Sequence, residues 1–187
     1  MIDALFQIQG GYSLILMTNK KLVGVRDPFG IRPLVIGKLK KSYIFASETC
    51  ALDIVGAEFI REIDNGEIVV IEDGKLSSIK PFPKQKSRPC VFEYIYFSRP
   101  DSILNGKTAY EYRKKFGAQL ANEDNINADL VVPVPDSGNA AALGYAEKKG
   151  FKFDLGLIRN HYVGRTFIEP SQQIRSLGVK LKLNPNI

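Results

Sequence analysis

The sequence is poor in the residues that build covalent and metal-based centres. It has two cysteines and one histidine among 187 residues. Cys50 and Cys90 lie far apart and lack CxxC spacing, so neither a disulfide scaffold nor a redox motif is expected. With His161 as the only histidine, the sequence offers no Cys/His metal cluster and no assembled Ser-His-Asp or Cys-His group. We therefore expect a reducing compartment, the cytoplasm, as the location.

Long apolar runs are also absent. No stretch approaches the roughly 20 apolar residues that span a bilayer, so we expect no membrane partner. Residues 2–11, "IDALFQIQGG", lack the basic segment and long apolar core of a signal peptide and look like the end of a helix. The hydrophobic content of 44% and charged content of 25% are those of a globular chain.

Acidic residues are fewer than basic ones, 20 against 26, which gives a net charge of +6. This excess favours an anionic partner, but it does not choose between nucleotide, nucleic acid and membrane. A basic surface that only aids solubility explains the charge equally well. Nucleic-acid binding therefore has no support beyond the net charge.

Short apolar runs separated by turns fill the first 85 residues and predict antiparallel strands. The runs span residues 12–18, 22–27, 34–39 and 42–48. Residues 49–57 fit a short helix. Residues 66–82 predict a hairpin whose turn is Asp73-Gly74.

The pattern changes after "PFPKQKSRP" (81–89), which is rich in proline and basic residues and predicts a boundary. An aromatic segment follows, and residues 106–124 have helical spacing. A buried strand at 128–135, a helix closed by Gly150 and a strand at 151–158 predict a parallel strand–helix–strand unit. An open parallel sheet usually has more strands, and "KLKLNPNI" offers no closing element. The sequence thus looks cut at both ends.

The stretch "VVPVPDSGNAA" (131–141) is a local candidate for an anion site. Asp136 and Ser137 follow a strand and precede a helix, the position where ligands of open α/β sheets bind. Backbone N–H groups at the helix start attract anions, and a serine hydroxyl can contact a phosphate or hydrated Mg²⁺. The alternative is that either residue is only a helix N-cap.

The segment "HYVGRTFIEPSQQIR" (161–175) fits neither a helix nor a strand pattern. From Arg159 onward the chain carries arginines and lysines but a single acid. Arginine suits bidentate phosphate contact, the aromatics Tyr162 and Phe167 exclude water, and Gly164 permits movement. A solvated basic loop explains the composition as well. His161, as a lone histidine, is more typical of a surface residue than of a base.

Four segments resemble the glutamine phosphoribosylpyrophosphate amidotransferases, also called amidophosphoribosyltransferases. "YVGRTFI" (162–168) with "PSQQIR" behind it resembles their flexible loop, and "CVFEYIYFSRPDS" (90–102) resembles the segment that joins their two domains. "RDPFGIRPL" (26–34) and "ASETCALD" (46–53) resemble their glutaminase half. The latter two occur more loosely in other class II glutamine amidotransferases such as asparagine synthetase. The order of the motifs matches the family along the whole chain.

The resemblance implies an α+β fold followed by an α/β fold. Residues 1–85 would be the C-terminal half of a class II glutamine amidotransferase domain, an N-terminal-nucleophile (Ntn) hydrolase sandwich. Residues 86–105 would form an interdomain segment. Residues 106–187 would be the first part of a type I phosphoribosyltransferase domain.

The resemblance also implies an activity, the first committed step of de novo purine biosynthesis. Glutamine is hydrolysed, and its ammonia displaces pyrophosphate from phosphoribosyl pyrophosphate to give 5-phosphoribosylamine. The implied partners are phosphoribosyl pyrophosphate, glutamine, inhibitory purine nucleotides and further copies in a tetramer, with no nucleic acid. The implied cofactor is Mg²⁺.

By position, the resemblance assigns a pyrophosphate loop and a substrate loop. The pyrophosphate loop holds Asp136 and Ser137, with Ser137 linked to magnesium. The substrate loop holds Arg159, Tyr162 and Arg165. The family often has lysine at 159 and arginine at 161, so Arg159 keeps the charge while His161 makes its position pH-dependent.

Neither cysteine matches the family's catalytic nucleophile, which is an N-terminal cysteine, so no catalytic residue is expected in this chain. Cys90 matches the first ligand of a [4Fe–4S] cluster found in one branch of the family, but a cluster needs more cysteines than this chain has. We therefore expect an internal fragment that lacks both half-reactions. The alternatives are a non-catalytic nucleotide- or pyrophosphate-binding module and another class II glutamine amidotransferase.

Overall fold

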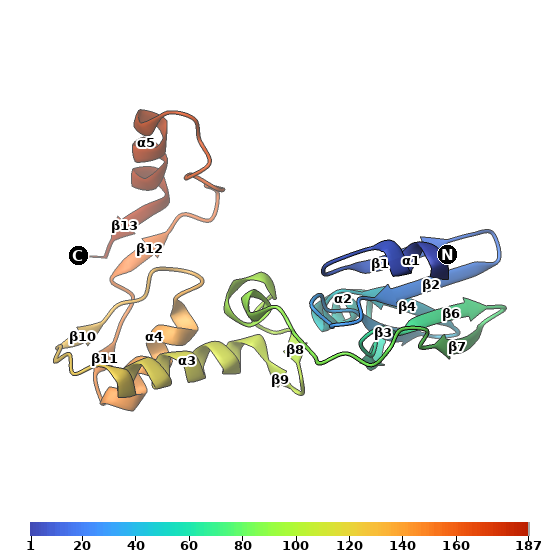
Figure 1. Cartoon of the computed structure of the whole chain (residues 1–187). Coiled ribbons are helices and arrows are strands. Elements are labelled where there is room, and N and C mark those ends of the chain that lie inside the picture. The colour runs from blue at the N-terminus through green and yellow to red at the C-terminus, as the bar shows by residue number, and fades with distance from the viewer. Residues whose placement is uncertain (187) are drawn as a thin grey trace. The chain divides into compact units, whose positions relative to one another are not determined.

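The computed structural model describes residues 1–186, which form two compact units, the first Met1–Ala109 and the second beginning at Tyr110 (Figure 1). Residues 86–105, predicted as an interdomain segment, belong to the first unit. The functional boundaries at residues 85 and 105 stay predictions. No helix among residues 1–186 is long and apolar enough to cross a membrane.

Two antiparallel sheets form the first unit, as the closely spaced runs predicted. The first sheet has the order β1-β2-β6-β7, with strands Ser13–Met17, Lys21–Arg26, Ile68–Glu72 and Lys75–Ile79. The second has the order β4-β3-β5, with strands Ser42–Ala46, Val35–Leu39 and Glu58–Glu62. Asp73 and Gly74 have φ values of 50° and 72°, which confirms the predicted hairpin turn.

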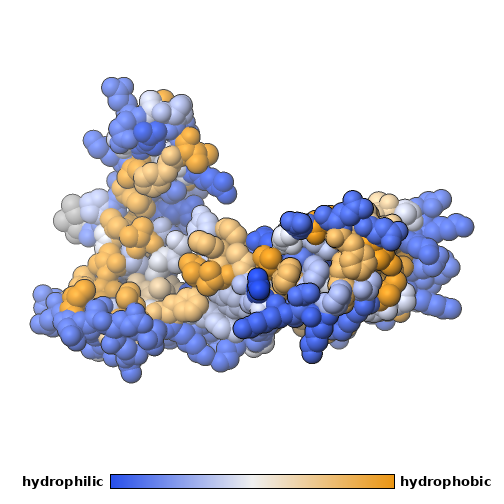
Figure 2. All heavy atoms as spheres, in the orientation of Figure 1, coloured by the Kyte–Doolittle hydropathy of each residue, from blue (hydrophilic) through white to orange (hydrophobic). Residues whose placement is uncertain are grey.

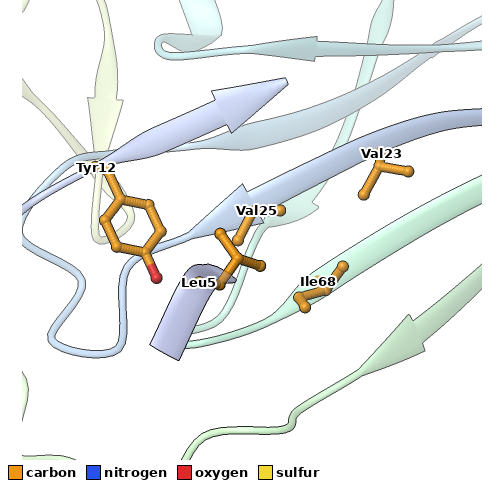
Figure 3. Close-up of a cluster of buried hydrophobic side chains, with 5 residues drawn as sticks. All are labelled: Leu5, Tyr12, Val23, Val25 and Ile68. Carbon is orange, nitrogen blue, oxygen red and sulfur yellow. The ribbon is translucent and has the colours of Figure 1, made fainter. Parts of the chain in front are cut away.

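The core of the first unit lies in three layers of apolar side chains. Between the sheets, Ile36 of β3 and Val69 of β6 are fully buried. On the outer face of the four-stranded sheet, α1 (Ile2–Gln7) buries Leu5 against Val25 and Ile68 (Figure 3). On the outer face of the other sheet, α2 (Thr49–Val55) buries Leu52. Both short helices were expected, and the result is a pair of sheets with one helix on each outer face.

One edge of the four-stranded sheet is open. Among residues 1–186, strand β1 pairs with β2 alone, and its Ile15, Leu16 and Met17 side chains are exposed. Exposed hydrophobic residues occur in both units, and many of them are visible in the space-filling view (Figure 2). An unpaired apolar edge is a template for association with another chain. Strand β1 is such an edge.

The proline-rich segment after β7 is anchored to the first unit. Backbone N–H groups of Arg88 and Cys90 donate to the carbonyl oxygens of Phe29 and Ile31, at 2.8 Å and 3.1 Å. A π-helix, η1 (Glu93–Phe97), follows, and then a small hairpin of β8 (Ile103–Leu104) and β9 (Lys107–Thr108). The segment is thus irregular in backbone but fixed in place.

The second unit contains the predicted strand–helix–strand element. Its first elements are α3 (Ala109–Glu123), β10 (Leu130–Val131), α4 (Asn139–Lys149) and β11 (Lys152–Phe153). Strands β10 and β11 pair in parallel, and Gly150 ends α4 in the left-handed conformation, as expected. The strands are shorter than predicted, and Leu130 and Val134 are exposed, so the prediction of a buried strand at 128–135 was wrong.

The end of the chain does have a closing element, contrary to expectation. Strand β12 (Leu157–Arg159) pairs antiparallel with β13 (Leu183–Pro185), and α5 (Gln172–Lys182) lies between them in sequence. The helix begins inside the segment 161–175, which was therefore wrongly predicted to be irregular throughout. Its start is set by Ser171, whose hydroxyl accepts a hydrogen bond from the N–H of Ile174 at 3.2 Å.

Candidate anion-binding site

A tight turn joins β10 to α4 and carries two of the predicted site residues. The N–H of Gly138 donates to the carbonyl of Val134 at 3.1 Å, and the N–H of Asn139 donates to that of Asp136 at 3.2 Å. The peptide bond between Pro135 and Asp136 is cis. A Cβ at Gly138 would lie 2.7 Å from the Val134 oxygen, so this turn requires glycine. The turn thereby places Asp136 and Ser137 just before the start of an 11-residue helix.

Neither Asp136 nor Ser137 caps α4. The N-cap is Gly138, and no side-chain hydrogen bond covers the helix start. Both side chains are exposed. The interpretation of these residues as mere N-caps is therefore wrong.

An ion pair links this turn to the end of β12. The guanidinium of Arg159, through Nη1, contacts Oδ2 of Asp136, 23 residues away in sequence. The side chains are 29% and 47% exposed. The Nε atom of Arg159 is buried and has no hydrogen-bond partner in the described part of the chain. The structure thus brings one residue of the predicted substrate loop to the predicted pyrophosphate loop.

The other predicted substrate-loop residues do not converge on Asp136. Tyr162 is fully exposed, at 100%, and Arg165 and His161 are exposed as well. The N–H of Tyr162 donates to Oδ1 of Asn160 at 3.0 Å, a local turn just after β12. These side chains extend into solvent in the structure.

Helix α5 holds the loop 160–170 in place, a role that the sequence analysis missed. Lys182 donates from Nζ to the carbonyl of Gly164 at 3.1 Å, and Arg175 donates from Nη1 to the carbonyl of Glu169 at 2.7 Å. Thr166 is buried against Gly178, where a Cβ would lie 3.0 Å from its methyl group. Arg175 and Lys182 are seven positions apart on one helix, so their shared face becomes apparent only once α5 is recognised.

The three family-like segments of the first unit, 26–34, 46–53 and 90–102, are joined by side-chain contacts. Arg32 forms an ion pair with Glu93 at 2.6 Å. Oε2 of Glu48 accepts hydrogen bonds from the N–H of Arg99 at 2.8 Å and from the hydroxyl of Ser102 at 2.7 Å. These contacts fasten the segment 90–102 to the two glutaminase-like motifs. They explain why residues 86–105 belong to the first unit.

Buried Asp27 shapes the "RDPFGIRPL" turn. Its Oδ1 accepts the N–H groups of Phe29 and Ile31, and its Oδ2 accepts that of Arg32, each at 3.0 Å. The side chain is completely buried. A carboxylate with this set of donors has a structural role in forming the turn.

Cys90 lies in the wall of a cavity of about 870 Å³ within the first unit and is half-buried. The same wall includes Arg26, Glu93 and Tyr94. Within residues 1–186, no three His, Cys, Asp or Glu side chains are grouped so as to hold a metal ion. Cys50 is buried in α2. The described residues alone therefore do not form a site for an iron–sulfur cluster.

The comparisons with known proteins first give a class. A family described as "Glutamine amidotransferase domain" matches residues 1–53. Among solved structures, the glutamine phosphoribosylpyrophosphate amidotransferase of B. subtilis, complexed with ADP and GMP, is 45% identical, with a TM-score of 0.88. That match covers 98% of this chain and 40% of the solved one.

The curated relatives that the chain resembles are amidophosphoribosyltransferases. The amidophosphoribosyltransferase of Rhizobium etli is 57% identical in an alignment of 190 positions that covers 99% of this chain and 38% of the relative. The chloroplastic amidophosphoribosyltransferase 1 of Arabidopsis thaliana is 53% identical over 99% of this chain and 33% of its own length. The chain is thus homologous along its whole length to the amidophosphoribosyltransferases and spans little more than a third of theirs.

Proposed function

We propose that this chain is the central part of an enzyme that makes 5-phosphoribosylamine, glutamate and pyrophosphate from phosphoribosyl pyrophosphate, glutamine and water. The observation that carries the proposal is the turn at 135–138, which is linked by Asp136 to the start of the loop 160–170. The homology of the whole chain to amidophosphoribosyltransferases supports the same assignment. It favours this enzyme over another class II glutamine amidotransferase, because the similarity includes the second unit.

In the proposed enzyme, the second unit binds the pyrophosphate group of the substrate. The N-terminus of α4, which has no side-chain cap, presents the positive end of the helix dipole to an anion. Arg159 lies beside this turn, and Arg165 and Tyr162 are exposed on the neighbouring loop. Closure of that loop would bring its arginine and aromatic side chain over the bound substrate and exclude water.

Ser137 fits the proposed magnesium link. Its hydroxyl is exposed beside the Asp136 carboxylate, so the turn offers two oxygen ligands. Mg²⁺ keeps several waters and is held largely by substrate phosphates, so a few protein oxygens suffice. When bound with the substrate, the ion would neutralise charge on the departing pyrophosphate.

The first unit would contribute part of the glutaminase domain. In the complete protein, that domain would be the sandwich of an Ntn hydrolase. Its sheets supply a scaffold, and no catalytic nucleophile is assigned to Cys50 or Cys90. We expect the isolated chain to show neither glutamine hydrolysis nor pyrophosphate release, since it spans 38% of its Rhizobium relative. In this account, the contacts of Glu48 and Arg32 keep the glutaminase part in fixed contact with the segment 90–102.

Cys90 would supply one ligand if the complete protein holds a [4Fe–4S] cluster. Its half-buried position beside a cavity agrees with that role, but the remaining ligands have no counterpart among the described residues. No step of the proposed reaction depends on the cluster.

Purine nucleotides are the proposed inhibitors, and the B. subtilis relative is complexed with ADP and GMP. Tetramer formation and a cytoplasmic location stay predictions, and the Arabidopsis relative is named chloroplastic.

A non-catalytic nucleotide- or pyrophosphate-binding module is the second candidate function. The same exposed turn and loop would serve it, so binding alone does not separate it from the enzyme.

The binding site can be tested by calorimetric titration of the chain with inorganic pyrophosphate and Mg²⁺. The Arg165→Ala substitution is expected to weaken binding about 10-fold, because it removes one charge-assisted contact. Lys148→Ala, which removes an exposed charge from the other end of α4, is the control and should leave the affinity unchanged. Equal affinities for the two variants, or no binding to the unmodified chain, would contradict the proposed site.

A further inference from the structure

Asp136 and Arg159 form an ion pair in the structure. In the proposed function, both side chains interact with the ligand instead. We propose that the Asp136 carboxylate takes the place of a phosphate group in the ligand-free protein and gives up Arg159 when pyrophosphate and Mg²⁺ arrive. The inference rests on the proposed function, because it assigns a regulated exchange to the same site. Arg159 would change partners, and Asp136 would turn toward the incoming magnesium ion.

The first support comes from the incomplete bonding of Arg159. A guanidinium has a planar set of donors that matches two oxygens of a phosphate. Here Nη1 contacts Asp136, while the buried Nε has no acceptor among residues 1–186. A buried donor without a partner is unfavourable, so a ligand that satisfies Nε would gain free energy that the carboxylate does not provide. The present pair is thus a replaceable contact.

The second support comes from the charge of Asp136. Its carboxylate lies in the turn before α4, where the positive end of the helix dipole favours an anion. A pyrophosphate bound there would be repelled by the carboxylate unless a cation lay between them. Ser137 supplies a neighbouring oxygen for that cation. Asp136 therefore opposes the free anion and favours its magnesium complex.

The third support is that the nearby bases of α5 are already engaged. Arg175 and Lys182 donate to carbonyl oxygens of the loop 160–170. Moving them to a ligand would release the loop from its helix. Arg159 can move to a ligand at the cost of the contact with Asp136 alone. The ion pair is therefore the contact whose exchange leaves the rest of the unit in place.

The Asp136→Asn substitution tests the exchange in the full chain. Calorimetric titration with inorganic pyrophosphate is carried out with and without Mg²⁺. Without Mg²⁺, the variant should bind about 5- to 10-fold more tightly than the unmodified chain, because the competing charge is gone. Mg²⁺ should strengthen binding to the unmodified chain by a larger factor than binding to the variant. Asp129→Asn, at an exposed acid before β10, removes the same charge without touching Arg159 and should behave as the unmodified chain.

A second measurement does not depend on the ligand. In the ligand-free variant, amide hydrogen exchange should accelerate at residues 159–163, while the amides of α4 keep their protection and show that the unit is folded. The exchange would be overturned if the Asp136→Asn and Asp129→Asn variants bound pyrophosphate equally well without Mg²⁺ and gained equally in affinity from Mg²⁺. That result would leave the proposed binding site intact. Failure of magnesium pyrophosphate to bind any of the three chains would overturn the binding site and the exchange together.

Discussion

The Glu67→Gln substitution is expected to lower the free energy of unfolding of the first unit by about 3 kcal/mol at pH 7. Glu67 is 2% exposed, and its two carboxylate oxygens accept from Nη1 and Nη2 of Arg61 at 2.8 Å and 2.7 Å. The hydroxyl of Ser78 and the N–H of Asp64 also donate hydrogen bonds to this carboxylate. The neutral amide would leave the Arg61 charge without its counter-ion, and denaturant unfolding would report the loss.

The same carboxylate predicts the acid sensitivity of the unit. Burial acts to raise the pKa of Glu67, but the hydrogen bonds from Arg61, Ser78 and Asp64 outweigh it and lower the pKa to about 2, from an ordinary 4.5. The stabilisation is therefore complete above pH 4.5 and is lost as the pH falls toward 2. The glutamine variant should lack this part of the pH dependence.

A matched control is Glu72→Gln, which breaks an exposed ion pair with Lys21 at 3.0 Å. Its expected cost is below about 1 kcal/mol, because both side chains are exposed to solvent. If Glu67→Gln destabilises the chain no more than Glu72→Gln at pH 7, the role assigned to the Arg61–Glu67 pair is wrong.

The Gly144→Ala substitution is expected to destabilise the second unit by about 2 kcal/mol, although alanine favours helices over glycine. A Cβ at Gly144 in α4 would lie 1.9 Å from the carbonyl oxygen of Lys114 in α3. Gly117 in α3 meets the carbonyl of Ala141 in the same way, at 1.8 Å. The obstacle in both cases is backbone, so the two helices would have to separate. Protection of the α3 and α4 amides against hydrogen exchange would measure the effect.

The control for this prediction is Gly164→Ala, at a position where a Cβ would meet nothing within 4 Å. Its expected effect is below about 0.5 kcal/mol. An increase in stability for Gly144→Ala, as helix propensity alone would give, would show that the close approach of α3 and α4 does not limit the packing of the unit.

Local signals in the sequence predicted local structure well. The hairpin turn at Asp73-Gly74 requires positive φ values that glycine and aspartate tolerate, and the end of α4 at Gly150 has the same cause. The parallel pairing of β10 and β11 follows from the helix between them. In each case, the residues that decide the structure are close in sequence.

Pairings between distant segments were not predictable in the same way. Strand β6 pairs with β2, which precedes it by more than 40 positions, and that choice depends on which face each strand buries. Strand β5 (Glu58–Glu62) was missed because charged residues dominate it. Helix α5 was missed because its first turn lies in a segment that looked irregular. These elements are determined by tertiary burial more than by local propensity.

In the candidate site, too, local features were predictable from the sequence and contacts between distant segments were not. The position of Asp136 and Ser137 between a strand and a helix could be predicted from the sequence alone. The pairing of Asp136 with Arg159 could not, because it depends on where β12 lies. The hydrogen bonds from α5 to the loop 160–170 could not be predicted either, because the helix itself was not predicted. The structure therefore shows an ion pair between two motifs, the turn at 135–138 and the end of β12, which the sequence analysis treated separately.

The central claim, that this chain is part of an amidophosphoribosyltransferase, can be tested by exchange of segments. The matching region of the Rhizobium etli relative, 57% identical, would be replaced by this chain, and glutamine-dependent release of pyrophosphate would be measured. The account predicts that the hybrid forms pyrophosphate and that Arg165→Ala in the transferred segment greatly reduces the rate. A correctly folded hybrid that hydrolyses glutamine but releases no pyrophosphate would contradict the role assigned to the second unit.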